Sequence, residues 1–378
     1  MRRIFFWAHF VMGLAVGLFI LVMAVTGTLL TYERQITAAA QNSAVHKTAD
    51  AKPLSLESLS DAAIAAGGTS GNVLTISRDP SHVAKLAKGR RETVLLDPYT
   101  GEVLPDASKG VKAVFSRIES IHRWFAFTGK RTDAGEFLKS TANLVFALIL
   151  ISGAVLWWPR KWKWPIVKTQ LFFRRGLSNA KARHYNWHHV LAAWAFVPLL
   201  AIVATGIVFS YDWANRLVYA AYGEEPPKRS GPPAEQAAGT ETASEALPAF
   251  EPAPLDDLIA QAMAPYGGWR RLEITLPAPD ASELSVLVDS GNGVQAWKKR
   301  TVTLARDGSG IVGTPVGDLA SPGSKARRVI RFLHTGEVLG IVGQTIAGLA
   351  ALSAVVLVYT GLSLAIRRLI RMRRSAKA

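Results

Sequence analysis

Two histidines occupy matching places in two apolar segments of the chain. Placing His9 on His188 aligns, without a gap, Thr26-Gly27 with Thr205-Gly206 and Tyr32-Glu33 with Tyr211-Asp212. A titratable side chain inside an apolar helix is a functional candidate, because burying it there is costly. A neutral imidazole gives its lone pair to a transition metal such as iron, or takes part in a proton relay. The repeat therefore indicates a shared chemical role for His9 and His188 in two related halves.

The neighbouring residue, His189, is the alternative partner for His9. Aligning Trp7 with Trp187 pairs His9 with His189, whereas the Thr-Gly and Tyr-acid alignment pairs it with His188. The second alignment matches more positions. We therefore prefer His188 and keep His189 as the alternative.

The elements that must position these histidines are four apolar segments, each long enough to cross a bilayer. Hydrophobic residues make up 49% of the 378-residue chain, which is typical of a membrane protein. We expect spans at residues 4–33, 137–158, 187–211 and 331–366. The first has no small-residue cleavage site, so we expect it to be a span and not a signal peptide.

Positive charge is concentrated at the ends of these spans. The net charge is +16, and its clusters lie at Arg2-Arg3, in residues 159–183 and in residues 367–374. All three fall on one side of a four-span protein, and the positive-inside rule makes that side the cytoplasm. We expect a bacterial inner-membrane protein with cytoplasmic termini, a basic loop at 159–186 and a basic tail at 367–378. No nucleic-acid-binding motif accompanies the charge, so the expected partner is the lipid bilayer and not nucleic acid.

Two long segments, residues 35–136 and 212–330, separate the spans and are expected on the periplasmic side. Each has a helix pattern followed by strand patterns: "LESLSDAAIAAGG" precedes "RETVLLDPYTGEVL", and "PLDDLIAQAMAPYGG" precedes "KRTVTLARDGSGIVG". A Pro- and Gly-rich stretch, residues 223–248, is expected to be a flexible linker. The sequence thus predicts a mainly α membrane protein, with a four-helix bundle and two external α+β domains.

Several motifs together resemble those of a known family. The unit ending in "LDPYTGEVL" resembles the PepSY domain, and "IHRWF", "LISGAVLWWPRKW", "WHHVLAAW" and "FLHTGEVLG" resemble motifs of PepSY-associated transmembrane proteins. Within that family, the chain resembles the FoxB-type ferric-siderophore reductases. This resemblance implies an inner-membrane protein that binds two b-type haems and reduces a ferric siderophore to release Fe(II).

Four histidines sort into two pairs by depth. His9 and His188 each begin an outgoing span, whereas His122 and His334 each precede a returning span. A haem iron with two axial imidazoles needs one ligand on each side of its ring, and facing helices of a bundle supply them. Cysteine is absent, which excludes iron–sulfur clusters and covalently attached c-type haem. We therefore predict an inner b-type haem on His9 and His188 and an outer one on His122 and His334.

A Ser/Thr-Gly pair recurs in all four spans, and we expect its glycines to clear space for the two macrocycles. Gly27 and Gly206 are expected near the outer haem, and Gly153 and Gly361 near the inner one. In a continuous helix, His334 and Gly361 would lie on opposite faces. A break in the helix at the glycines of "HTGEVLG" would remove this conflict with a shared role. Ordinary helix packing is the alternative role for these small residues.

The remaining histidines have no assigned ligand role. His184 is expected at the cytoplasmic interface, while His46 and His82 lie in external sequence. His122 precedes the second span by more than a dozen residues, so we expect it on a short interfacial helix.

The predicted activity is that of an oxidoreductase that moves electrons across the membrane. Two imidazoles fill both axial positions, which leaves no open site for oxygen. No G-x-G-x-x-G motif opens a helix after a strand, so the electron donor is expected to be a separate flavoprotein, a ferredoxin or quinol. Two alternatives carry no haem: a regulatory or peptidase-inhibiting PepSY membrane protein, and a transporter that uses its histidines as a proton relay.

Overall fold

The computed structural model describes residues 1–45, 51–89, 92–227, 252–264, 268–312 and 320–375. The chain divides into two compact units, and each is made of segments distant in sequence. The helical unit comprises Met1–Glu33, Ala113–Pro226 and Pro322–Ala378. The sheet unit comprises Arg34–Lys112 and Pro227–Ser321. His46 lies outside the described residues, as does most of the expected linker, from residue 228 on.

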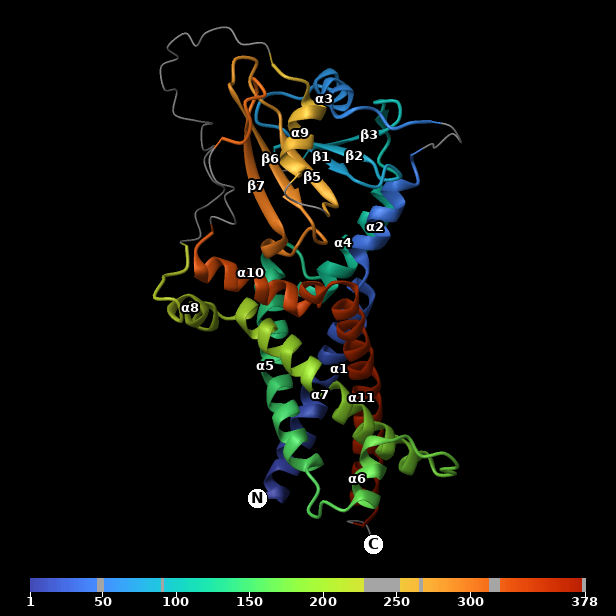
Figure 1. Ribbon diagram of the computed structural model, residues 1–378. Helices are drawn as coiled ribbons and strands as arrows, with labels where there is room; N and C mark the ends of the chain where they lie inside the picture. Colours follow the sequence, from blue (N-terminus) through green and yellow to red (C-terminus); the bar gives the residue numbers. More distant parts are fainter. Residues whose placement is uncertain (46–50, 90–91, 228–251, 265–267, 313–319, 376–378) are drawn as a thin grey trace. The chain divides into compact units, whose positions relative to one another are not determined.

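Four long helices form the helical unit and lie side by side in Figure 1. They are α1 (Arg2–Leu30), α5 (Thr132–Trp157), α7 (Ala180–Ser210) and α11 (Gly340–Ser375). Within the described part of the chain, four helices are long and apolar enough to cross a membrane, and these four account for them. The chain is therefore a membrane protein with a helical bundle, as the hydropathy pattern predicts.

Short helices close the two ends of the bundle. They are α4 (Lys109–Trp124), η1 (Gly129–Arg131), α6 (Trp164–Leu171), α8 (Asp212–Ala220), α10 (Pro322–His334) and η3 (Glu337–Leu339). In Figure 1, α8 and α10 lie at one end of the bundle, and α6 lies at the other with the N-terminus and the end of α11. The expected interfacial helix carrying His122 is α4.

The middle of the bundle is filled by small and aliphatic side chains from all four long helices. This apolar layer consists of Ala24, Leu150, Ala195, Leu199, Val203, Ala350 and Ala354. Alanine lets the helix backbones approach one another closely, and the larger leucine and valine side chains fill the remaining space. The apolar layer therefore separates the two ends of the bundle with tightly packed hydrocarbon.

The fourth span begins later than the sequence indicates. We expected it at residues 331–366, but α10 ends at His334 and α11 starts at Gly340. Between them, Gly336 and Gly340 adopt φ angles of +77° and +69°, which glycine tolerates and other residues rarely do. The break that the glycines of "HTGEVLG" suggested is therefore present, and it places His334 on a separate helix.

In the described part of the sheet unit, seven strands form one antiparallel sheet in the order β4-β3-β2-β1-β5-β6-β7. The strands are β1 (Val73–Ser77), β2 (Ala84–Lys88), β3 (Glu92–Leu96), β4 (Val103–Leu104), β5 (Arg271–Thr275), β6 (Glu283–Asp289) and β7 (Lys299–Ala305). The other elements are α2 (Glu33–Asn42), α3 (Leu56–Ala65), α9 (Leu255–Met263) and η2 (Ala296–Lys298). Buried side chains of α3 and α9 join those of the strands in one core, so both helices cover the same face (Figure 1).

The two segments predicted as separate domains share this sheet. Each has the predicted order of a helix followed by strands, but β1 pairs with β5, and Leu74 lies opposite Ile274. Asp256 of α9 also accepts hydrogen bonds from the backbone N–H groups of Leu56 and Glu57 at the start of α3. A strand edge left unpaired exposes a row of backbone donors and acceptors. Pairing β1 with β5 removes one such edge from each module and joins the two into one unit.

Candidate functional site

Five histidines of the helical unit make the same contact with a neighbouring helix: Nδ1 of the ring lies within hydrogen-bonding distance of a serine or threonine hydroxyl. Four of them are the histidines that the depth argument selected. These pairs are His9 with Ser152 (3.0 Å), His122 with Thr26 (2.8 Å), His188 with Thr360 (3.0 Å) and His334 with Thr205 (3.0 Å). The fifth is His184, 2.8 Å from Ser363. The hydroxyl partners of the four, unlike Ser363, are the Ser/Thr members of the recurring Ser/Thr-Gly pairs.

The hydroxyl hydrogen bonds fix which ring nitrogen carries the proton. Thr360 donates its hydroxyl hydrogen to the carbonyl of Val356 at 2.7 Å, so its oxygen is left to accept from His188. Nδ1 of His334 also donates to the Ile202 carbonyl, at 2.9 Å, three residues before its hydroxyl partner. Nδ1 is therefore the protonated nitrogen, and Nε2 keeps a lone pair for a ligand.

The glycine that follows each hydroxyl makes room for an imidazole in three of the four cases. A Cβ built on Gly153 would meet Cε1 of His9 at 3.2 Å, and one on Gly361 would meet Cε1 of His188 at 3.2 Å. A Cβ on Gly27 would lie 3.3 Å from Cε1 of His122. Gly206 differs, because a Cβ there would meet the amide of Asn143. The sequence reasoning found these glycines but gave them a different neighbour, a macrocycle instead of an imidazole.

His9 and His188 face each other across the bundle. Their ring centroids are 6.5 Å apart and their planes are nearly perpendicular, at 89°. An imidazole nitrogen binds a first-row metal at about 2 Å. The ring centre lies about 1.1 Å further back in a five-membered ring with bonds near 1.33 Å. A metal held between two such rings would therefore separate their centres by about 6.2 Å, which is close to the observed spacing.

A large cavity surrounds this pair. Its volume is about 1180 Å³, and its lining includes His9, His188, Gly153 and Gly361. Most of the other lining side chains are aliphatic or aromatic, whereas one region is basic, with Lys181, Arg367, Arg368, Arg371 and Arg374. No aspartate or glutamate is among the lining residues that the structure describes. The cavity can thus hold a large and mostly apolar ligand beside the two imidazoles.

His122 and His334 form the second pair, at the end of the bundle where α4 and α10 lie. Burial, and to a smaller extent the charge of His334, lowers the pKa of His122 to about 4. Such a ring is neutral at pH 7, which is the form that binds a metal. Their hydroxyl partners, Thr26 on α1 and Thr205 on α7, are the positions that the gapless alignment of the two helices matches. The apolar layer lies between this pair and the pair of His9 and His188.

His189 and His184 occupy different settings from the four paired histidines. His189 lines the same cavity, but its Nδ1 contacts the carbonyl of Tyr185 in its own helix, and no Ser/Thr-Gly pair serves it. The structure therefore places His188, and not His189, in the repeated arrangement. His184 is buried against Ser363 and Tyr359, and no glycine follows Ser363. His82 is exposed and contacts Ser77 in the sheet unit.

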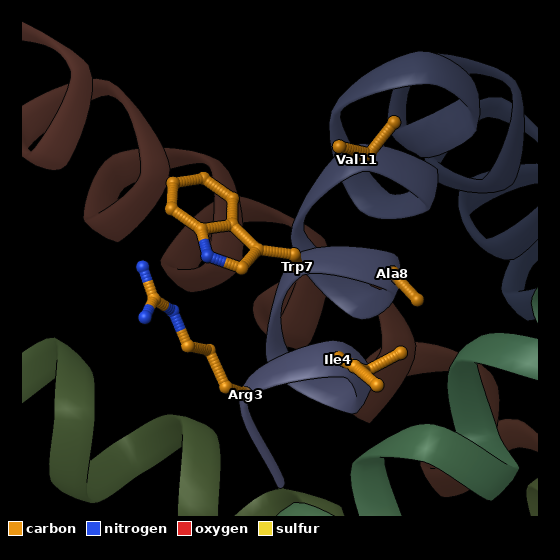
Figure 2. Close-up of a pocket in the computed structure, with 5 residues that line it drawn as sticks. All are labelled: Arg3, Ile4, Trp7, Ala8 and Val11. Atoms are coloured by element: carbon orange, nitrogen blue, oxygen red, sulfur yellow. The ribbon is translucent and has the colours of Figure 1, made fainter. Parts of the chain in front are cut away.

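A second hollow, shown in Figure 2, lies on one side of α1 alone. Its lining residues are Arg3, Ile4, Trp7, Ala8 and Val11, all from the first turns of that helix. Ligand sites bring together polar groups from several elements, and this shallow surface does not. The larger cavity of His9 and His188, lined by residues of several helices, is therefore the stronger candidate.

Comparison with known proteins gives one finding. A family model described as the PepSY-associated TM region matches residues 6–368, which is nearly the whole chain. No curated protein matches the chain.

Proposed function

Because the chain belongs to the family of PepSY-associated TM regions, we propose that it is a di-haem electron-transfer protein of the bacterial inner membrane. It takes electrons at the cytoplasmic end of the bundle and passes them to a periplasmic ferric siderophore. Reduction of the iron releases it from the siderophore as Fe(II). The termini and the basic segments 159–186 and 367–378 are then cytoplasmic, as the positive-inside rule requires.

The observation that carries this proposal is the arrangement of His9 and His188. Their ring centroids are separated by about the distance that a shared metal needs, and Nδ1 of each ring is hydrogen-bonded to a hydroxyl. Gly153 and Gly361 supply the space that the two rings occupy. Because Nδ1 keeps its proton, Nε2 is the atom that would bind the metal. Hydrogen bonds to metal-binding histidines usually have this effect in metal sites.

The residues fit a b-type haem better than a bare metal ion. Each pair supplies two imidazole ligands, whereas first-row metals take four to six, so the remaining ligands must come with the cofactor. A haem with two axial imidazoles has no open coordination site and transfers single electrons. His9 and His188 would hold the inner haem, and His122 and His334 the outer one.

The chain's own residues then have three tasks. The four hydroxyls orient the imidazoles and keep their protons on Nδ1. The three glycines beside the rings allow the helices to close around them. The apolar layer excludes water and carries no titratable group, so the path between the two histidine pairs favours electrons over protons.

The acceptor and the donor follow from different considerations. The resemblance to FoxB-type reductases points to a ferric siderophore as acceptor, since Fe(II) binds oxygen chelators more weakly than Fe(III). The donor is a flavoprotein or ferredoxin that docks on the basic cytoplasmic surface, or quinol from the bilayer. The bundle itself carries no nucleotide-binding motif.

Sealed vesicles test this function. Purified protein is reconstituted into liposomes that enclose dithionite, and a ferric hydroxamate siderophore is added outside with a chromogenic Fe(II) chelator. We expect Fe(II) to appear outside only when the protein is present, and the His9→Ala/His188→Ala double variant to abolish it. A His82→Ala variant is the matched control and should conduct normally. Colourless, folded protein that gives no Fe(II) would contradict the proposal and favour a cofactor-free regulatory role.

A further inference from the structure

The cavity of His9 and His188 contains two buried hydrogen-bond donors that have no hydrogen-bond partner among the described residues. They are Nε of Arg368, on α11, and Nε1 of Trp157, the last residue of α5. Both residues line the cavity. Buried polar groups in proteins nearly always have a partner, so an exception in a cavity indicates a ligand atom. Two donors in one cavity indicate an acceptor-rich group on that ligand.

The setting of Arg368 identifies the group as an anion. Its guanidinium carbon lies 4.5 Å from the ring centroid of Phe6 and 5.2 Å from that of Trp7, so aromatic faces hold the charge in place. Among the described residues, no carboxylate forms an ion pair with it. Nearby cavity residues add positive charge, chiefly Arg371, Arg374 and Lys181. A planar guanidinium can bind both oxygens of a carboxylate at once, and among the common anions only phosphate fits it as well.

We propose that Arg368 and Trp157 form a carboxylate-binding subsite that holds the acidic edge of the cofactor in the inner cavity. This inference rests on the proposed function. A b-type haem carries two carboxylates on one edge and is apolar elsewhere, and the cavity has the same division between a basic region and an apolar remainder. The acidic edge therefore points toward the end of the bundle where α5 and α11 finish, and the apolar edge points toward the apolar layer.

Comparison of two porphyrins tests the subsite without altering the protein. The protein is produced without haem in a His122→Ala/His334→Ala background, so that the inner site alone is measured. It is then titrated with haem and with haem dimethyl ester, whose carboxylates are blocked, and the Soret band reports binding. We expect haem to bind at least about tenfold more tightly than the ester, which is the factor that one charge-assisted hydrogen bond supports.

Substitutions then assign the preference to the two residues. Arg368→Gln and Trp157→Phe should each lower haem affinity, leave ester affinity nearly unchanged and so remove most of the preference, while Arg368→Lys should keep part of it. Arg373→Gln, a change on the same helix outside the cavity lining, is the control and should behave as the parent protein. Size-exclusion profiles and thermal melts verify that each variant is folded.

The outcomes separate this inference from the function on which it rests. Equal affinity of the parent protein for haem and its ester would overturn the subsite and leave the di-haem proposal standing. Preference for haem that persists in both Arg368→Gln and Trp157→Phe would also overturn it. Binding of neither porphyrin would contradict the proposed function, and the subsite with it.

Discussion

Replacing Gly361 by alanine tests whether the helix surface beside His188 is shaped for that imidazole. A Cβ at this position would lie 3.2 Å from Cε1 and 3.7 Å from Nδ1 of His188. The first distance is closer than a comfortable carbon contact, so the ring must move by a few tenths of an ångström. That movement displaces Nε2 and lengthens the hydrogen bond from Nδ1 to Thr360, which is 3.0 Å in the structure.

The size of the effect follows from the cost of over-packing. Adding a methyl group to a tightly packed position costs about 1–3 kcal/mol, and each 1.4 kcal/mol or so is a tenfold change in an equilibrium constant. We therefore expect Gly361→Ala to weaken haem binding at the inner site about 5- to 150-fold. Alanine also favours the helix over glycine by up to about 1 kcal/mol. This raises the stability of the apoprotein, so unfolding would not explain weaker haem binding.

The assay is a Soret titration of apoprotein, with a thermal melt of each variant. Gly153→Ala should reproduce the effect, because its Cβ would meet the other ring of the same pair, His9, at 3.2 Å. Gly27→Ala should weaken the outer site instead, through His122. Gly110→Ala is the matched control, since nothing lies within 4 Å of its added Cβ. If Gly361→Ala and Gly110→Ala bind two haems with equal affinity, the glycine does not shape the site and the reasoning is refuted.

Three further changes test other parts of the account. Thr360→Val keeps the side-chain shape but removes the acceptor for Nδ1–H of His188, so we expect the inner site to bind haem about 10- to 100-fold more weakly. The midpoint potential of the haem, measured by redox titration, should also shift, and an unchanged potential would show that the hydroxyl does not act on His188. Leu199→Asp puts a carboxylate into the apolar layer and should lower the free energy of unfolding by about 2.5–3.5 kcal/mol. Thermal melts in detergent compare it with the control variant Leu199→Met, and equal melting temperatures would mean that water reaches the layer. Leu74→Ala, in the strand that joins the two modules of the sheet, should cost about 2–5 kcal/mol, whereas Val103→Ala, at a 59% exposed position, should cost little; similar losses in the two variants would contradict a continuous core.

The spans and the histidine pairs were accessible from sequence because the membrane restricts both. A bilayer requires a long apolar helix for each crossing, so hydropathy locates α1, α5, α7 and α11, although it places the start of α11 too early. A gapless alignment of two such helices then fixes relative depth, which is how His9 and His188 were matched. Depth alone cannot say which faces meet, and so the choice between His188 and His189 needed the hydrogen bond to Thr360.

The parts that sequence reasoning missed depend on contacts between distant segments. The pairing of β1 with β5 joins Leu74 to Ile274, two hundred positions apart, and no local pattern specifies which strand edges will meet. The role of Thr360 and its three counterparts as partners of Nδ1 was likewise hidden, because each hydroxyl serves a histidine on another helix. The repetition of Ser/Thr before glycine was the available signal, and only its glycine was interpreted. Arg368 and Trp157 carried no sequence signal apart from their place beside a basic helix end.

The most direct test of the central claim is the haem content of the purified protein and its histidine variants, measured as pyridine haemochrome per chain. The account predicts two haems in the parent protein and one in His9→Ala, in His188→Ala and in their double variant, because both residues hold the same haem. It predicts the same pattern for His122→Ala and His334→Ala. Folded protein without haem, or a His9→Ala/His188→Ala double variant that loses both haems or keeps both, would contradict it.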